Sequence, residues 1–196
     1  MDRDRFARQR DFILEIDKEK EILRQTHIAG YARQEDDAEH AWHMAVMAYL
    51  LREYSNEPVD IARAMIMCLI HDVVEIDAGD SYAYDAVAQA SHVEREICAA
   101  DRIFGLLPDD QARDLRSIWD EFEAGETVEA RFVKAMDNVQ PMMLNDFNGG
   151  RDWSAHDIAI RDTRRRNANT RLGSEELASY VEERFEANVQ KGSLLP

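Results

Sequence analysis

A histidine and four carboxylates, Asp77 among them, lie close together where an apolar run ends. The segment AMIMCLI, residues 64–70, leads directly to His71 and Asp72, and Glu75 and Asp80 come within the next eight residues. Burying a carboxylate costs several kcal/mol unless a cation or hydrogen bonds compensate it. The sequence therefore predicts a positive centre at this point, and a bound metal ion would supply one.

Helical spacing puts further ligand-type side chains on inward faces. His40 lies on one stripe with Met44, and Asp137 lies on one with Val133 and Leu144. A single inward histidine is more often an ordinary core residue. Two histidines and two aspartates on three apolar faces are much harder to explain by packing. Imidazole and carboxylate ligands suit Mn²⁺, Fe²⁺, Co²⁺, Zn²⁺ or a similar ion, whereas the two cysteines of the chain lack the spacing of a closed structural zinc site.

The apolar residues repeat with helical periodicity along nearly the whole chain, so helices are expected to position these side chains. With only 8 Gly and 4 Pro in 196 residues, long uninterrupted helices are expected. We expect no β-strand, and the predicted fold is an all-α bundle of about six to eight helices. The expected helices span residues 4–25, 38–54, 58–74, 91–107, 108–125, 127 to beyond 143, 154–170 and 174–190, with a loop at 76–90.

The composition limits the function classes. The chain length suits one domain with its own core, and no linker or repeat divides it. A net charge of −16 argues against binding polymeric nucleic acid, whose affinity depends on Lys and Arg contacts to phosphate. The apolar runs are far shorter than the ~20 residues of a membrane span. Because there is no signal-peptide core and Cys68 and Cys98 fall in apolar helical patterns, we expect a cytoplasmic protein with reduced thiols.

Three blocks, AEHAWH, HDVVEIDAGD and FVKAMDN, together resemble the HD-domain metal-dependent phosphohydrolase superfamily, and in particular its 5'-deoxynucleotidase-like branch. The resemblance covers roughly residues 20–145. It implies a helical HD domain over residues 1–196, with the helices of 154–190 packed on the motif-bearing core, and a homodimer. It also implies one divalent cation (Mn, Co, Fe, Zn or Mg) with four ligands, His40, His71, Asp72 and Asp137.

The same resemblance implies roles for charged residues around the metal. Glu75 and Asp80 would be catalytic carboxylates, although the sequence does not divide the roles between them. Arg24, Arg33 and Lys134 are the candidates for binding the substrate phosphate. Arg33 could equally form a salt bridge with the acids around it, and Lys134 could simply neutralise the site.

Some residues suggest finer distinctions. Gln25 follows Arg24, where relatives that select against ribose often carry Trp, so strict 2'-deoxy selectivity is not expected. His43 is expected to pack between helices. His92 is the one further histidine between His71 and Asp137, which favours a single metal over two. The run RDTRRRN, residues 161–167, is expected to form an intramolecular salt-bridge face rather than an anion-binding patch.

The function that the resemblance implies is release of phosphate from nucleoside or deoxynucleoside 5'-monophosphates. The alternatives within the superfamily are a phosphodiesterase or a pyrophosphohydrolase of signalling nucleotides. Those branches typically carry extra histidine ligands or further domains. The alternative outside enzymes is a binding module that keeps the metal as a structural element, but such a site needs no carboxylates beyond its ligands, and Glu75 and Asp80 would be surplus to it.

Overall fold

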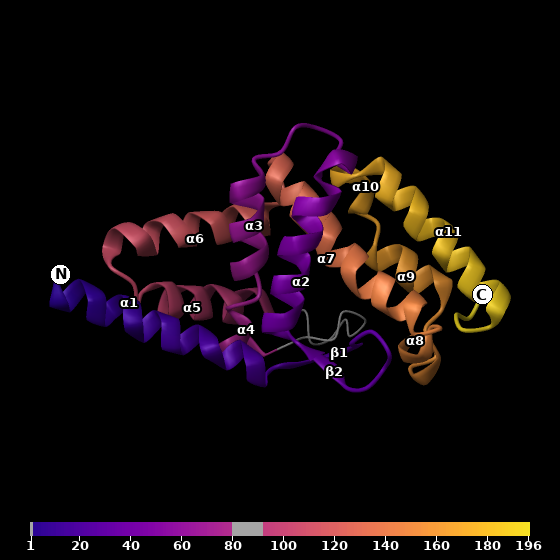
Figure 1. Ribbon diagram of the computed structural model, residues 1–196, viewed down its shortest axis with the longest axis horizontal. Coiled ribbons are helices and arrows are strands. Elements are labelled where there is room, and N and C mark those ends of the chain that lie inside the picture. The colour runs from indigo at the N-terminus through magenta and orange to yellow at the C-terminus, as the bar shows by residue number, and fades with distance from the viewer. Residues whose placement is uncertain (1, 80–91) are drawn as a thin grey trace.

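Helices form almost all of the computed structural model, which describes residues 2–79 and 92–196 (Figure 1). The predicted all-α class is confirmed. Among the described residues, eight α-helices have seven residues or more: α1 (Arg3–Ile16), α2 (Asp37–Leu51), α3 (Ile61–Ile70), α5 (His92–Phe104), α6 (Asp109–Ala124), α7 (Val128–Phe147), α9 (Ile160–Arg166) and α11 (Glu175–Lys191). Shorter helical segments are η1 (Asp17–Glu21), η2 (Arg52–Tyr54), α4 (Glu75–Ala78), α8 (Arg151–Ala155) and α10 (Thr170–Gly173).

A small antiparallel sheet is the main departure from the expected fold. The helix expected over residues 4–25 ends at Ile16, because the following DKEKE segment carries no apolar stripe that could pack as a helix. The chain then forms β1 (Leu23–His27), which pairs with β2 (Gln34–Asp36). The connecting loop is held against the α7–α8 region, since the amide of Gly30 donates to Asn148 Oδ1 at 2.9 Å. This hairpin, and not a helix, carries Arg24 and Gln25.

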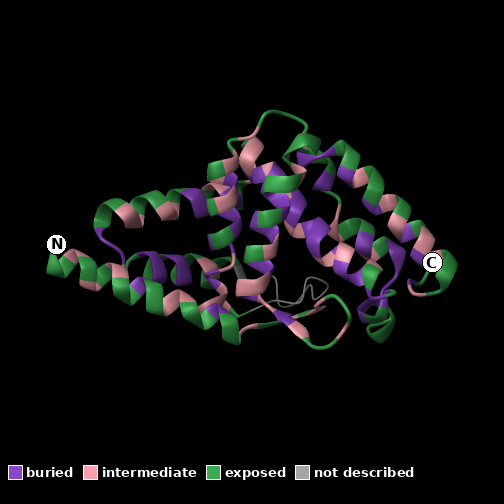
Figure 2. Ribbon diagram, viewed as in Figure 1, coloured by how far each residue is buried: buried purple, intermediate pink, exposed green. Residues whose placement is uncertain are grey.

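Helix α7 is the central element of the fold. It packs against α2, α3 and α6 on one part of its surface and against α10 and α11 on another (Figure 1). Buried residues follow it along its length, and Phe132, Val133 and Met136 are completely inaccessible (Figure 2). Because α2, α3 and α7 are mutually packed, polar residues on their inward faces must meet in the interior.

Local signals determine where two of these helices begin. Asp36 and Glu39 form a capping box at the start of α2, each side chain bonding the other's backbone amide, which puts His40 in the first turns of the helix. Asp60 caps α3 by accepting from the amides of Ala62 and Arg63.

Two further helix boundaries differ from expectation. The helix expected over 58–74 ends at Ile70, and the chain turns before α4. The helix expected over 154–170 is divided into α8, α9 and α10, because Asp157 has a left-handed backbone (φ 51°) and the next segment pairs with Leu195 near the C-terminus. The expected loop at 76–90 lies mostly outside the described residues. No helix in residues 2–79 and 92–196 has both the length and the apolar character needed to cross a bilayer.

Candidate metal centre and cavity

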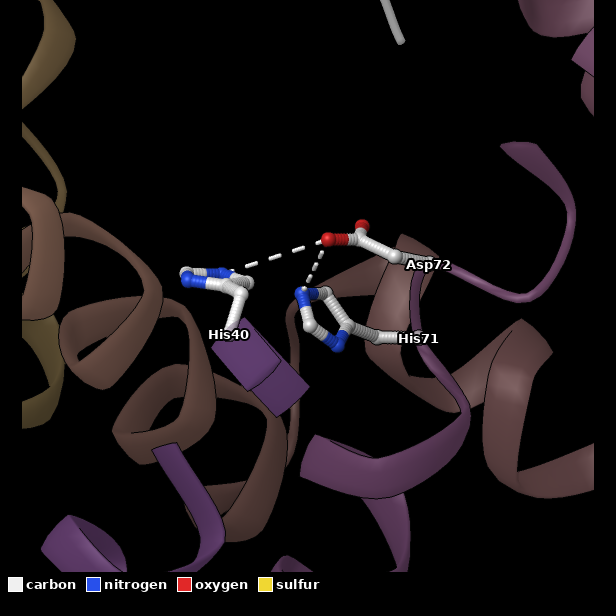
Figure 3. A group of neighbouring side chains, drawn as sticks. All are labelled: His40, His71 and Asp72. Carbon is white, nitrogen blue, oxygen red and sulfur yellow. Dashed lines mark ion pairs between the residues drawn. The ribbon is translucent and has the colours of Figure 1, made fainter. Parts of the chain in front are cut away.

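Four side chains from three helices converge on one point. His40 comes from α2, His71 and Asp72 follow the end of α3, and Asp137 comes from α7. His40 Nε2 lies 3.3 Å from Asp137 Oδ1 and 3.9 Å from Asp72 Oδ2. His71 Nε2 lies 3.1 Å from Asp72 Oδ2 and 4.0 Å from Asp137 Oδ1. Figure 3 shows His40, His71 and Asp72 pointing toward one another, in a group able to hold a metal ion.

Both imidazoles are oriented through the nitrogen that faces away from this point. His71 Nδ1 lies 2.8 Å from the carbonyl oxygen of Cys68, which can only accept, so Nδ1 donates. His40 Nδ1 lies 3.0 Å from Gln140 Oε1. Each ring therefore turns its Nε2 toward the carboxylates, where this nitrogen can coordinate a metal ion when it carries no proton. This is the arrangement that metal-ligating histidines adopt, and the four residues fit a divalent cation.

The charges around this point favour a cation. Burial opposes ionisation of Asp137, but Arg166 and His40 outweigh it and hold the pKa of Asp137 well below its usual range. Burial likewise opposes ionisation of Asp72, yet His71 and Arg24 keep its pKa low. Burial lowers the pKa of His71, but Asp72 and Asp137 overcome that effect and raise it to about 9. Both carboxylates are thus ionised, and a bound cation would compete with the His71 proton.

Arg24 reaches this centre from strand β1. Its Nη1 donates to Asp72 Oδ2 at 2.8 Å and to Asp37 Oδ1 at 3.0 Å. Asp37 is completely buried, and burial together with Asp72 raises its pKa to about 6, against the lowering effect of Arg24. The sequence reading missed Asp37, although its spacing of three residues from His40 on α2 puts the two on one face.

A cavity of about 250 Å³ opens beside the four convergent side chains. Its walls include His71, Asp72 and Asp137 together with Glu75, the first residue of α4. Arg24, Gln25 and Lys134, all singled out in the sequence, also line it. The ammonium of Lys134 lies 4.2 Å from the centre of the Phe122 ring, which holds the side chain by a cation–π contact. The cavity thus joins the candidate metal centre to basic side chains.

Arg33 lies on the surface and does not line the cavity. Its side chain is more than half exposed, and its Nη1 donates to Glu39 Oε2 at 2.7 Å. The residues described as lining the cavity do not include it. The structure thus shows the salt bridge that the sequence left open for Arg33, formed where the residue before β2 meets the first turn of α2, and its substrate-binding role stays a prediction. Asp80 and the side chain of His92 lie outside the described residues.

Arg166 is a cavity residue that the sequence reading assigned elsewhere. The expected salt-bridge face does form at Arg164, whose Nε donates to Glu182 at 2.9 Å. Two residues later, Arg166 turns inward: its Nη2 donates to Asp137 Oδ2 at 3.1 Å, and it lines the cavity. No local pattern distinguishes the two arginines, since only the packing of α9 decides which one faces α7.

Comparisons with known proteins give consistent results. A family model described as the HD domain matches residues 16–178. Human 5'-deoxynucleotidase HDDC2 is 31% identical over 111 residues, which are 57% of this chain and 53% of the human protein. The Danio rerio protein of the same name is 33% identical over 106 residues, covering 54% and 52% of the two chains. The match thus spans about half the length of these curated relatives.

A solved structure matches over nearly the full length. It is a crystal structure of a predicted metal-dependent phosphohydrolase from Magnetospirillum magnetotacticum MS-1. The TM-score is 0.93 and the sequence identity 45%, over 98% of this chain and 96% of that one.

Proposed function

Since this chain belongs to the HD-domain family, we propose that it is a metal-dependent phosphomonoesterase that releases phosphate from nucleoside or deoxynucleoside 5'-monophosphates. The family match confirms the resemblance that the three sequence blocks carried. The observation that carries the proposed activity is the convergence of His40, His71, Asp72 and Asp137 beside a cavity that is lined by the last three and by basic side chains. The name 5'-deoxynucleotidase of the curated relatives supports the substrate class, and the name metal-dependent phosphohydrolase of the solved structure supports the metal-dependent chemistry.

In this proposal one divalent cation per chain, Mn, Co, Fe, Zn or Mg, is held by His40, His71, Asp72 and Asp137. A bound cation would polarise a phosphoryl oxygen and lower the pKa of a water molecule. Arg24 and Lys134 would bind phosphate oxygens. Glu75, beside Asp72 on the cavity wall, would orient the attacking water and accept its proton. Asp80 stays the second predicted catalytic carboxylate.

The proposed activity is tested by measuring inorganic phosphate released from a nucleotide panel with several divalent metals. The panel should contain deoxynucleoside and ribonucleoside 5'-monophosphates, a cyclic dinucleotide as a phosphodiester, and a nucleotide with a pyrophosphate linkage. Release from the monophosphates alone is expected. Preferential cleavage of the diester or pyrophosphate would favour the superfamily alternatives, and no turnover on any phosphoester would favour a metal-containing binding module.

Gln25 predicts limited discrimination between deoxyribose and ribose. It lies next to Arg24 on the cavity wall, and an amide can hydrogen-bond a 2'-hydroxyl where a bulky ring would exclude it. We expect kcat/KM for a deoxynucleotide and its matched ribonucleotide to differ by less than about tenfold. A tenfold ratio is about 1.4 kcal/mol, which is within the net free energy of one ordinary hydrogen bond. A several-hundredfold preference for the deoxy substrate would mean that another residue excludes the hydroxyl.

Arg166 predicts a further contact to the substrate phosphate. It is one-third exposed and faces the cavity on the Asp137 side, whereas Arg24 contacts Asp72. Because a charge-assisted hydrogen bond contributes about 1.5–3 kcal/mol, Arg166→Gln should lower kcat/KM about 10- to 100-fold. Arg164→Gln is the matched control, since Arg164 lies on the same helix and pairs with Glu182. If the metal content falls instead, Arg166 acts only by holding Asp137.

The remaining proposals concern the assembly and location of the protein. We propose a single HD domain over residues 1–196, a homodimer and a cytoplasmic location, with small nucleotides rather than nucleic acid as ligands. The two free cysteines support the cytoplasmic location. The net charge of −16 supports small nucleotides rather than nucleic acid as ligands. A dimer is supported by large apolar side chains exposed on the adjacent helices α2 and α3, namely Trp42, Val46, Tyr49, Leu50, Ile66 and Leu69.

A further inference from the structure

A buried polar network lies behind His40, on the side away from the cavity. Gln140 of α7 and Glu35 of β2 are both almost completely inaccessible, as is His40 itself. Gln140 Oε1 lies 3.0 Å from His40 Nδ1, while Gln140 Nε2 lies 2.6 Å from Glu35 Oε1 and 3.0 Å from His43 Nδ1. None of these contacts was expected from the sequence, which assigned His43 a packing role.

The chemistry of Glu35 determines the orientation of the whole network. A carboxylate can only accept hydrogen bonds, so the Gln140 group that faces Glu35 must be the NH₂. One N–H then points to Glu35 and the other to His43 Nδ1, which uses both donors of the amide. The carbonyl Oε1 is consequently turned to His40 and accepts from its Nδ1.

The amide orientation in turn decides which nitrogen of His40 carries the proton. If Nδ1 donates to Gln140, the Nε2 of a neutral ring has a lone pair, and this is the atom that faces Asp72 and Asp137. If the amide were reversed, its NH₂ would face Nδ1 and favour a proton on Nε2, where it would block coordination. Glu35, linked to His40 through Gln140 and with its Oε2 3.7 Å from His40 Nδ1, can thus control the opposite ring nitrogen, which it does not touch.

We propose that Glu35, acting through Gln140, selects the metal-binding tautomer of His40, so that both are positioning residues of the metal centre. The proposal rests on the proposed function only in taking His40 as a ligand. It requires no knowledge of the substrate, because the selected property is the affinity of the protein for the metal.

The test is a titration of metal-depleted protein with Co²⁺ alone, followed by its visible absorption, for wild type and four variants. Glu35→Gln lets residue 35 donate to Gln140 and removes the bias, and Gln140→Leu removes the acceptor for His40. Each should weaken Co²⁺ binding about 10- to 100-fold, the usual effect of losing a partner behind a ligand. Glu39→Gln is the matched control. Glu39 lies four residues after Glu35 but pairs with Arg33 instead of with Gln140. Glutamine can replace glutamate in the capping box at the start of α2, so the helix should be unaffected. This variant should bind Co²⁺ like wild type.

The decisive variant exchanges the two residues, Glu35→Gln with Gln140→Glu. It restores one carboxylate and one amide, with Glu at position 140 accepting from both His40 and the new Gln, and Co²⁺ affinity should return close to wild type. The proposal is overturned if Glu35→Gln binds Co²⁺ normally, or if the exchange variant binds as weakly as the single variants while its Tm is unchanged. Lack of Co²⁺ binding by wild type would overturn the metal centre itself, whereas lack of phosphate release would affect only the proposed activity.

Discussion

Replacing Asp72 by alanine is expected to abolish binding of the divalent cation and, with it, phosphate release. Asp72 Oδ2 lies 3.1 Å from His71 Nε2 and 3.9 Å from His40 Nε2, so it is central to the four proposed ligands. The change also removes one of the two carboxylates to which Arg24 donates, which leaves the buried positive charge next to the metal position less compensated. The loss of a ligand and the less compensated charge of Arg24 both weaken binding of a cation at this site.

Elemental analysis of protein purified without chelator measures this prediction. Wild type should contain one divalent ion per chain, and Asp72→Ala close to none. Asp77→Ala is the control, because Asp77 lies five residues further on and its carboxylate pairs with Arg102 on the surface. If Asp72→Ala keeps the full metal content after reconstitution, the proposed site is wrong.

The second large effect is expected at Glu75. Glu75→Gln should lower kcat by about 10²–10⁴-fold, the usual contribution of a general acid–base group, while metal content and Tm stay near wild type. Glutamine has nearly the same volume and can still hydrogen-bond, but it cannot accept a proton. Glu75 begins α4 and lines the cavity with His71 and Asp72, yet it is additional to the four proposed ligands.

Single-turnover and steady-state rates, with metal analysis of the same samples, separate the possible roles. Asp77→Asn is the matched control on α4, because its side chain points to Arg102. Loss of metal from Glu75→Gln would make Glu75 a ligand and contradict the assigned role. Full activity would assign the proton transfer to another group, with Asp80 as the next candidate.

Helical periodicity made much of this arrangement predictable. The inward faces of α2 and α7 follow from residues three and four positions apart, and such spacing is a local property that the sequence shows directly. His40, His71, Asp72 and Asp137 were therefore expected to meet once three apolar helices were packed. The end of the first helix was less predictable: strand β1 pairs with the nearby β2, and Asn148, 121 positions further along the chain, donates to the carbonyl of His27.

Partnerships between side chains on different elements needed the tertiary structure. Arg24 and Arg33 were equivalent candidates in the sequence, but the hairpin turns Arg24 toward Asp72 and leaves Arg33 on the surface with Glu39. Arg164 and Arg166 were likewise equivalent until the position of α9 directed Arg164 to Glu182 of α11 and Arg166 to Asp137 of α7.

The sequence by itself determined the helical class, the four convergent polar residues and the family, because each depends on spacing within a segment. Only the tertiary structure decided which cations reach the cavity and how His40 is oriented. Glu35 and Gln140 are 105 positions apart, and Arg166 is 29 from Asp137. Contacts at such separations depend on how whole elements pack, because no short-range pattern specifies them.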